Sequence, residues 1–219
     1  MSRIDETIQA KIDKRRQLEA AGVLVHPYSY AKTHTLAIAR NSLDQIVKTA
    51  GRVMAWRTHG QVVFADLVDQ SGKIQVLLHA DTLGAEKFKL LNLIDQGDFL
   101  AVTGMVTTTK TGEITIQATE FQVMGKTLRP IPTTWNQAED KEVRFRKRYL
   151  DMLVNPATRQ ILDARWLIEK EIRRYLQDEH DFVEVETPVL QALYGGTNAK
   201  PFTTHMNALD TDYYLRLAP

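Results

Sequence analysis

The feature that most constrains the fold is a change of hydrophobic period near residue 51. From there to about residue 123, apolar residues recur at every second position, a pattern typical of strands with one face in a core. It predicts strands at 52–56, 62–68, 73–78, 99–106 and 113–123. A helix from a cap at Asp81 or Thr82 to about Ile94 interrupts the series after its third strand.

Three strands, one helix and two strands is the order of the five-stranded OB-fold β-barrel, which commonly binds single-stranded nucleic acid on one face. A generic small β-domain shares this order, so the order alone does not settle the fold. The flanking segments are predicted to contain helices. The chain is therefore expected to be α+β.

Alternation also predicts which side chains leave the barrel core. In the first three strands it places Arg52, Phe64 and Gln75 on the outer face. An aromatic ring, an amide and a cation on one face are the groups that read an unstacked base. Each has an ordinary alternative: a ring under a loop, plain surface polarity, and a cation paired with an acid. Their shared face favours binding.

The alternation also predicts two local features of the strands. Alternation in the first strand points Ala55 inward and Trp56 outward. In the fifth strand, Phe121 and Val123 have the opposite phase from the residues before them, which predicts a slip or bulge near Glu120.

The segments before the barrel read as a helix over 4–21, stopped by Gly22, then mostly loop with a short helix at 42–48. The first helix carries four cations that are expected to be exposed, either as a solvated face or in contact with a nucleic-acid backbone: Lys11, Lys14, Arg15 and Arg16.

After the barrel, a linker over 128–148 ends in a basic run, which is either a hinge or a phosphate contact. Asn155 as cap and Pro156 in the first turn predict a helix. Strands are expected at 182–188 and 213–217, with a loop at the glycine pair between them.

The amino-acid composition excludes several kinds of functional site. The 219 residues include no cysteine, which excludes disulfides, thiolate zinc sites and cysteine nucleophiles. The net charge of +1 says little about partners. No apolar run approaches the ~20 residues of a membrane span, and the first residues lack a signal-peptide core. A cytoplasmic protein with no membrane association is expected.

Two segments then carry a specific resemblance. Residues 144–153, Arg-Phe-Arg-Lys-Arg-Tyr-Leu-Asp-Met-Leu, and 182–188, Phe-Val-Glu-Val-Glu-Thr-Pro, resemble the domain junction and motif 1 of class II aminoacyl-tRNA synthetases with an N-terminal OB domain. The segments at 195–202, 204–210 and 214–219 resemble the bacterial-type lysyl-tRNA synthetases in particular. Two alternatives stay open, a non-catalytic OB-fold module that binds tRNA or other single-stranded RNA, and an aspartyl- or asparaginyl-type synthetase.

The resemblance implies roles for barrel residues. Phe64, Gln75 and Glu120 match the aromatic, glutamine and glutamate that recognise the central uridine of the anticodon in the family. Arg52 matches a family arginine on the same surface.

The resemblance also implies roles for residues that follow the linker. Pro188 matches the motif 1 proline of the dimer interface, and Gly195 and Gly196 match a loop that lines the lysine pocket. Asp181 stands where motif 1 usually has a glycine. Two further departures from the family pattern are Tyr194, for a common proline, and Met206, for a frequent histidine.

The implied activity is that of a lysine–tRNA ligase, which uses ATP and Mg²⁺ to activate lysine and transfers it to tRNA-Lys, acting as a homodimer. Its catalytic and metal-binding residues are expected beyond Pro219, so this chain is expected to hold none of them and to be inactive alone. The expected division is a helix and lead-in over 1–46, an OB-fold anticodon-binding domain over 47–127, the linker over 128–148, and an incomplete catalytic domain over 149–219.

Overall fold

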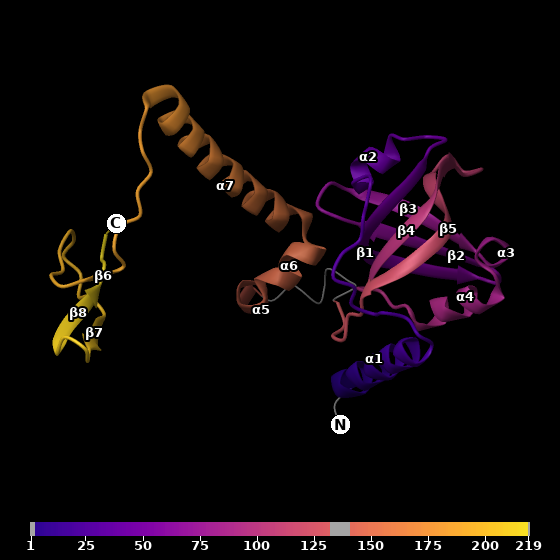
Figure 1. Ribbon diagram of the computed structural model, residues 1–219, viewed down its shortest axis with the longest axis horizontal. Coiled ribbons are helices and arrows are strands. Elements are labelled where there is room, and N and C mark those ends of the chain that lie inside the picture. Colours follow the sequence, from indigo (N-terminus) through magenta and orange to yellow (C-terminus); the bar gives the residue numbers. More distant parts are fainter. Residues whose placement is uncertain (1–2, 132–140, 219) are drawn as a thin grey trace. The chain divides into compact units, whose positions relative to one another are not determined.

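The computed structural model describes residues 3–131 and 141–218 (Figure 1). The chain forms two compact units, Met1–Leu150 and Asp151–Pro219. No helix in the described ranges is long and apolar enough to cross a lipid bilayer.

The first unit is a closed five-stranded barrel in the order β1-β2-β3-β5-β4. Its strands are β1 (Ile46–His59), β2 (Val62–Val68), β3 (Lys73–His79), β4 (Phe99–Thr108) and β5 (Ile114–Gly125). Neighbours pair antiparallel except β3 and β5, which pair in parallel and close the barrel. The fully buried side chains that fill it include Val53, Leu67, Ile74, Leu100 and Ile116. The predicted OB-type barrel is therefore confirmed.

A β-bulge in β1 overturns one prediction of phase. The register with β2 shifts between Val53 and Ala55, so Trp56 stands opposite the buried Ala65 and packs against the core. The prediction that Ala55 points inward and Trp56 outward is wrong, because the extra residue of a bulge reverses the alternation. From Trp56 onward, the next outward position in β1 is Arg57.

The slip predicted near Glu120 is confirmed. The β4–β5 register shifts between Thr103 and Gly104, where β5 carries one extra residue, Thr119, between Ala118 and Glu120. The strands approach so closely here that a Cβ on Gly104 would collide with the carbonyl oxygen of Gln117. Only glycine fits at this position without a backbone shift.

The helical segment between β3 and β4 begins slightly earlier than predicted and is broken into three pieces. It consists of α3 (Ala80–Leu83), α4 (Ala85–Leu90) and the 3₁₀ turn η1 (Leu91–Leu93). Gly84 separates the first two with φ +79°. The cap is His79, whose Nδ1 accepts a hydrogen bond from the Asp81 backbone N–H at 3.1 Å. The predicted cap at Asp81 or Thr82 is therefore wrong.

The segment before the barrel contains α1 (Arg3–Ala20) and α2 (Leu36–Arg40). The predicted first helix and its stop at Gly22, with φ +78°, are confirmed. The helix predicted at 42–48 is wrong, because residues from Ile46 onward pair with β4 as the start of β1. A long-range partner strand has overridden a weak local preference.

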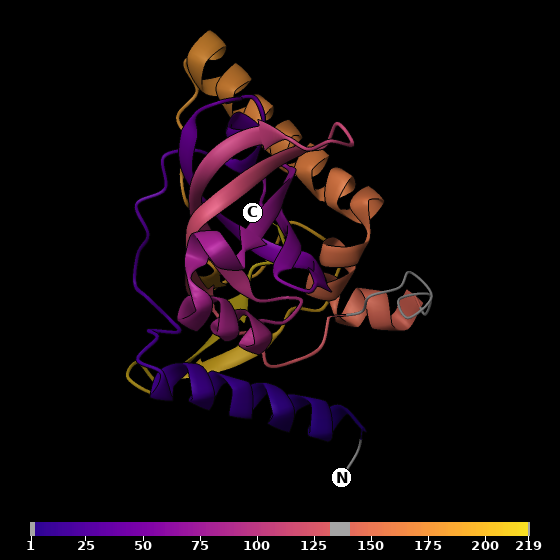
Figure 2. The same cartoon turned by 90° about the vertical axis from the view of Figure 1, so that its right-hand side faces the viewer.

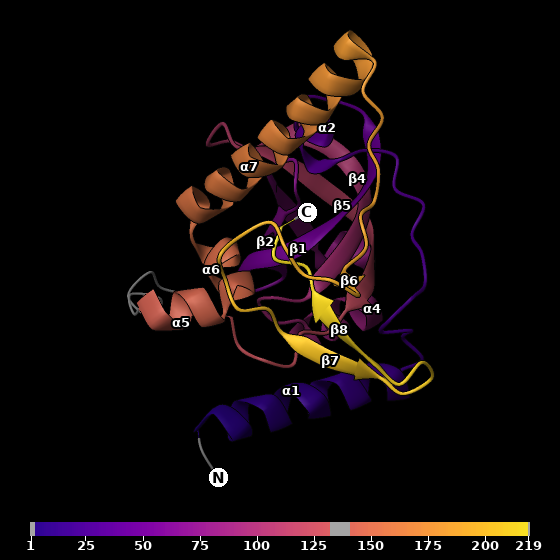
Figure 3. The same cartoon turned by 90° about the vertical axis from the view of Figure 1, so that its left-hand side faces the viewer.

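Helix α1 lies across one end of the barrel, beside α4 (Figures 2 and 3). Leu18 is fully buried there, and Lys14 donates to Asp95 at 2.6 Å. Lys11 and Lys14 are half-buried against the barrel. Arg15 is half-buried as well, so the expectation of exposure is wrong for these three cations and is confirmed for Arg16.

The predicted linker over 128–148 lies partly outside the described residues. Its basic run forms the helix α5 (Lys141–Arg146), followed by α6 (Arg148–Val154). Asn155 caps α7 (Pro156–Arg174) as predicted, with its side-chain oxygen accepting from the Ala157 N–H at 3.1 Å.

The rest of the second unit is a π-helical turn η3 (Tyr175–Glu179) and a three-stranded sheet in the order β6-β8-β7. Its strands are β6 (Leu190–Gln191), β7 (Thr203–Met206) and β8 (Thr211–Leu215). The last strand begins and ends earlier than the predicted 213–217. The strand predicted at 182–188 is wrong, because this segment has no partner strand among the described residues.

Candidate nucleic-acid interface

The outer face of β1–β3 carries a chain of polar contacts centred on Arg57. Its Nη2 donates to Oδ1 of Asp66 at 2.8 Å and to Oε1 of Gln75 at 3.2 Å. Gln75 in turn donates through Nε2 to Oγ1 of Thr115 at 2.9 Å, and Lys73 pairs with Asp66 at 2.8 Å. The side chain of Gln75 is therefore fixed in position before any ligand arrives.

Asp66 is the electrostatic centre of this chain. It is buried to 8% exposure, although it stands on the outer face of β2. Burial by itself raises the pKa of this carboxyl, but hydrogen bonds from Arg57 and Lys73 outweigh it and hold the pKa below its usual value. Asp66 is thus ionised at neutral pH and anchors both cations.

Phe64 completes the face. Across the sheet it stands opposite Arg57 on one side and Leu77 on the other, and it is half-buried. Gln75 pairs with Asp66, two positions along β2 from Phe64. The structure thus brings together the ring and the amide that the sequence placed on one face, with Arg57 as the cation beside them.

Arg52 does not join this group. Its Nη1 donates to the Gly97 carbonyl oxygen at 3.0 Å, and its guanidinium carbon lies 4.1 Å from the centroid of the Phe99 ring. Partial burial lowers the pKa of Arg52. The guanidinium faces β4 and the loop before it, so its predicted role stays a prediction.

Sequence reasoning missed Arg57 because the bulge at Met54 lies between it and the part of β1 with regular alternation. One signal could have found it. An apolar Trp56 at a position that alternation assigns to solvent indicates a change of phase, and this change moves Arg57 to the outer face.

Glu120 lies away from the Phe64–Gln75 face. It stands opposite Thr103 on β4, past the β5 bulge, and is exposed. It lines a polar hollow of about 220 Å³ together with Tyr30, Lys87, Thr103, Phe121 and Gln122. Its predicted role as a base reader also stays a prediction.

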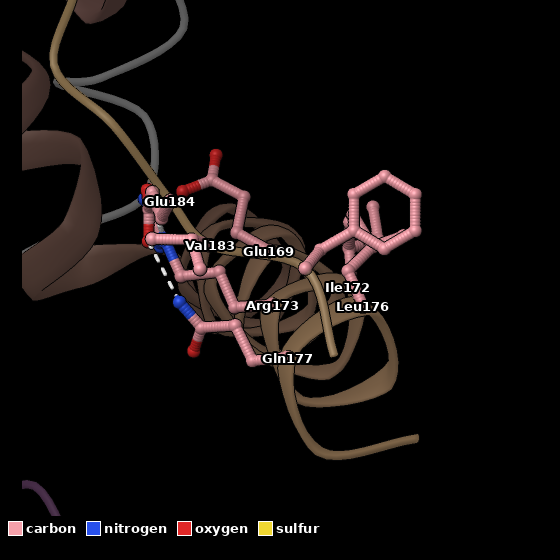
Figure 4. Close-up of a pocket in the computed structure, with 8 residues that line it drawn as sticks. Glu169, Ile172, Arg173, Leu176, Gln177, Val183 and Glu184 are labelled. Carbon is pink, nitrogen blue, oxygen red and sulfur yellow. Dashed lines mark hydrogen bonds and ion pairs between the residues drawn. The ribbon is translucent and has the colours of Figure 1, made fainter. Parts of the chain in front are cut away.

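In the second unit, the segment after η3 folds back along α7 and forms a hollow of about 350 Å³ (Figure 4). Arg173 donates to both carboxylate oxygens of Glu184 at 3.0 and 3.1 Å. Ile172, Leu176 and Val183 supply the apolar lining. This contact fixes the start of the segment that leads to Pro188.

The residues with predicted roles in this unit lie in irregular segments. Pro188 follows Thr187, whose carbonyl and hydroxyl oxygens both accept hydrogen bonds from Arg216, at 3.2 and 2.5 Å. Gly195 and Gly196 lie in the loop between β6 and β7, where Gly196 has φ +93°. The structure does not test their roles. In the described part of the chain, no group of three or more His, Asp and Glu residues is placed to hold a metal ion.

Two families of known proteins match this chain. Residues 47–124 match the OB-fold nucleic acid binding domain of the tRNA anticodon type. Residues 140–219 match the tRNA synthetases of class II (D, K and N).

Curated relatives match along nearly all of the chain. A lysine–tRNA ligase of Carboxydothermus hydrogenoformans is 40% identical over 220 residues, which cover 99% of this chain and 45% of the relative. One from Methanoculleus marisnigri is 42% identical over 230 residues, with 100% and 45% covered. The lysylphosphatidylglycerol biosynthesis bifunctional protein LysX of Nocardia farcinica is 40% identical over 98% of this chain and 19% of its own length. The chain is thus similar to these relatives along nearly all of its own residues, and it spans less than half of their length.

Proposed function

We propose that this chain supplies the anticodon-binding barrel and the motif 1 segment of a lysine–tRNA ligase. The complete enzyme activates lysine with ATP and transfers it to tRNA-Lys. The observation that carries the RNA-binding half is the fixed Gln75 amide, held by Arg57 and Thr115 beside the Phe64 ring. The lysyl assignment is supported by relatives named lysine–tRNA ligase.

The hydrogen-bonding capacity of Gln75 suits a base edge. A side-chain amide has two N–H donors and two oxygen lone pairs, and the contacts with Thr115 and Arg57 use one of each. One donor and one lone pair remain for a base that presents an acceptor next to a donor, as uracil does. Phe64 offers the ring on which that base stacks.

The remaining roles extend this proposal. Glu120 and Arg52 contact the same tRNA, Pro188 lies in a homodimer interface, and Gly195 and Gly196 line the lysine pocket. ATP and Mg²⁺ serve the complete enzyme in the cytoplasm. Among the described residues, no group of three or more His, Asp and Glu side chains is placed to hold that ion.

We also propose the division into a lead-in over 1–46, an anticodon-binding domain over 47–127, a linker over 128–148 and a catalytic segment over 149–219. The two family matches, to residues 47–124 and 140–219, support two functional parts.

The experiment is amino-acid-dependent exchange between pyrophosphate and ATP, with the protein encoded by the complete gene. Exchange with lysine, and none with aspartate or asparagine, is expected. Exchange with aspartate or asparagine alone would refute the lysyl assignment, and no exchange with any amino acid would favour a non-catalytic tRNA-binding module.

A further inference from the structure

The hollow around Glu120 has the composition of a ligand site. It is built from three parts of the first unit that are distant in sequence, namely Tyr30 from the lead-in, Lys87 from α4 and Glu120 from β5. Its volume of about 220 Å³ lies below the ~300–1,000 Å³ of sites for drug-sized ligands. A single planar ring system is the size of group that suits it.

The two charged side chains of this hollow have no partner among the described residues. Within the described ranges, the side chains of Lys87 and Glu120 make no hydrogen bond or ion pair, with each other or with any other residue. A cation and a carboxylate that line one hollow without pairing leave both free for a ligand. By contrast, Lys89 on the same helix pairs with Glu86 at 3.0 Å.

The wall of the hollow is fixed in place. The Tyr30 hydroxyl lies 3.4 Å from both the Val102 carbonyl oxygen and Oγ1 of Thr103, which ties the lead-in to β4. Phe121, next to Glu120, packs against the barrel core. Two aromatic rings therefore border the hollow on a rigid support.

The hollow is connected to the Phe64–Gln75 face by β5. That strand passes Gln75 at Thr115 and reaches Glu120 five residues later. At about 3.3 Å per residue the separation is roughly 16 Å, a span that an unstacked nucleic-acid strand covers in a few nucleotides. An RNA strand that contacts Gln75 beside Thr115 can therefore extend along β5 to the hollow.

We propose that this hollow binds a second nucleotide of the same single-stranded RNA, with Lys87 on a phosphate, Tyr30 or Phe121 against the base, and Glu120 on the base edge. An ionised carboxylate only accepts hydrogen bonds. Uracil and guanine present a ring N–H on their pairing edge, whereas cytosine and adenine present an unprotonated ring nitrogen there. The site thus favours uracil or guanine. The inference rests on the proposed RNA-binding function and adds Lys87 and Tyr30 to it.

The test is a titration of the 219-residue chain with a stem-loop RNA that has a uridine-rich loop, at several salt concentrations. Lys87→Gln removes one phosphate contact, so the slope of log affinity against log salt should become less steep by about 0.7, the value for one contact with a single strand. Lys89→Gln is the matched control and should leave the slope unchanged. A slope for Lys87→Gln equal to that of the unmodified chain would overturn the proposal.

A second set of titrations identifies the RNA phosphate that Lys87 contacts. Methylphosphonate groups replace the loop phosphates one at a time, which removes a single charge. One position should weaken binding to the unmodified chain and have no further effect on Lys87→Gln. If every position weakens both proteins equally, Lys87 contacts no phosphate and the inference fails.

Phe64→Ala separates this inference from the proposed function. If Phe64→Ala weakens binding and Lys87→Gln does not, the barrel binds RNA and the second nucleotide site is wrong. If neither change weakens binding, the RNA-binding face itself is wrong.

Discussion

The Nζ atom of Lys126 lies 2.6 Å from Oδ2 of Asp98, and both side chains are completely shielded from solvent. The same Nζ lies 2.5 Å from Oδ2 of Asp95, which Lys14 of α1 contacts from the other side. Asp98 also accepts backbone hydrogen bonds from Asp95 and Thr127. A buried ionic cluster thus joins α1, the loop that precedes β4 and the residue that follows β5.

Replacing Lys126 by methionine should lower the free energy of unfolding by about 3–5 kcal/mol, because it leaves a buried carboxylate at Asp98 without its counter-charge. Urea unfolding measures this change. The control is Lys14→Met, whose partly exposed ion pair should be worth about 1 kcal/mol or less. Equal losses for the two variants would contradict the central role of Lys126.

The cluster should also make stability depend on acid pH. Burial by itself raises the pKa of Asp95, but Lys126 and Lys14 outweigh it and lower the pKa below the usual value. A depressed folded pKa stabilises the native state above the unfolded pKa of about 3.9, and this contribution is lost as pH falls below it. Asp95→Asn should therefore reduce the loss of stability between neutral pH and pH ~3. Unfolding midpoints at the two pH values for both proteins provide the measurement.

Replacing Phe64 by alanine should weaken binding of a uridine-rich stem-loop by about 1–3 kcal/mol, the range for loss of one base–aromatic stack. Titration at fixed salt measures it. Tyr28→Ala removes an exposed aromatic ring of the lead-in and should leave affinity unchanged. Unaltered affinity of Phe64→Ala would remove the ring from the site.

Replacing Arg57 by methionine should have two effects with one cause. Loss of the guanidinium removes a hydrogen bond and a positive charge from Asp66, so the pKa of Asp66 should rise. It also releases the Gln75 amide oxygen, so RNA affinity should fall. Carboxyl titration by NMR and the stem-loop titration test the two effects separately. An unchanged Asp66 pKa would contradict the observed contact.

Asp181 follows the π-helical turn with φ +56°, in the left-handed region that favours glycine. Asp181→Gly should stabilise this turn by up to about 1 kcal/mol, whereas Asp181→Val should destabilise it by about 1–2 kcal/mol. The Phe182 amide reports on the turn, because its N–H donates to the Leu176 carbonyl oxygen at 3.0 Å. Its hydrogen exchange should slow in the glycine variant and accelerate in the valine variant.

The hydrophobic pattern of the sequence by itself predicted much of the secondary structure of the first unit. Period-two hydrophobicity records which side of each strand is buried, so it predicted the five barrel strands, the helix between the third and fourth, and the shared face of Phe64 and Gln75. The phase change in the fifth strand predicted its bulge. The asparagine–proline pair at 155–156 predicted the start of α7.

Only the tertiary structure decided the rest. The bulge at Met54 packs Trp56 against the core and brings Arg57 onto the outer face beside Phe64. The segment 182–188 has strand-like residues but no partner strand among the residues that the structure describes, and a strand exists only through its partner's hydrogen bonds. The contact of Lys126 with Asp98, and the approach of Lys87 to Glu120, join residues about 30 positions apart. Periodicity reports burial along one element, whereas these contacts depend on how separate elements meet.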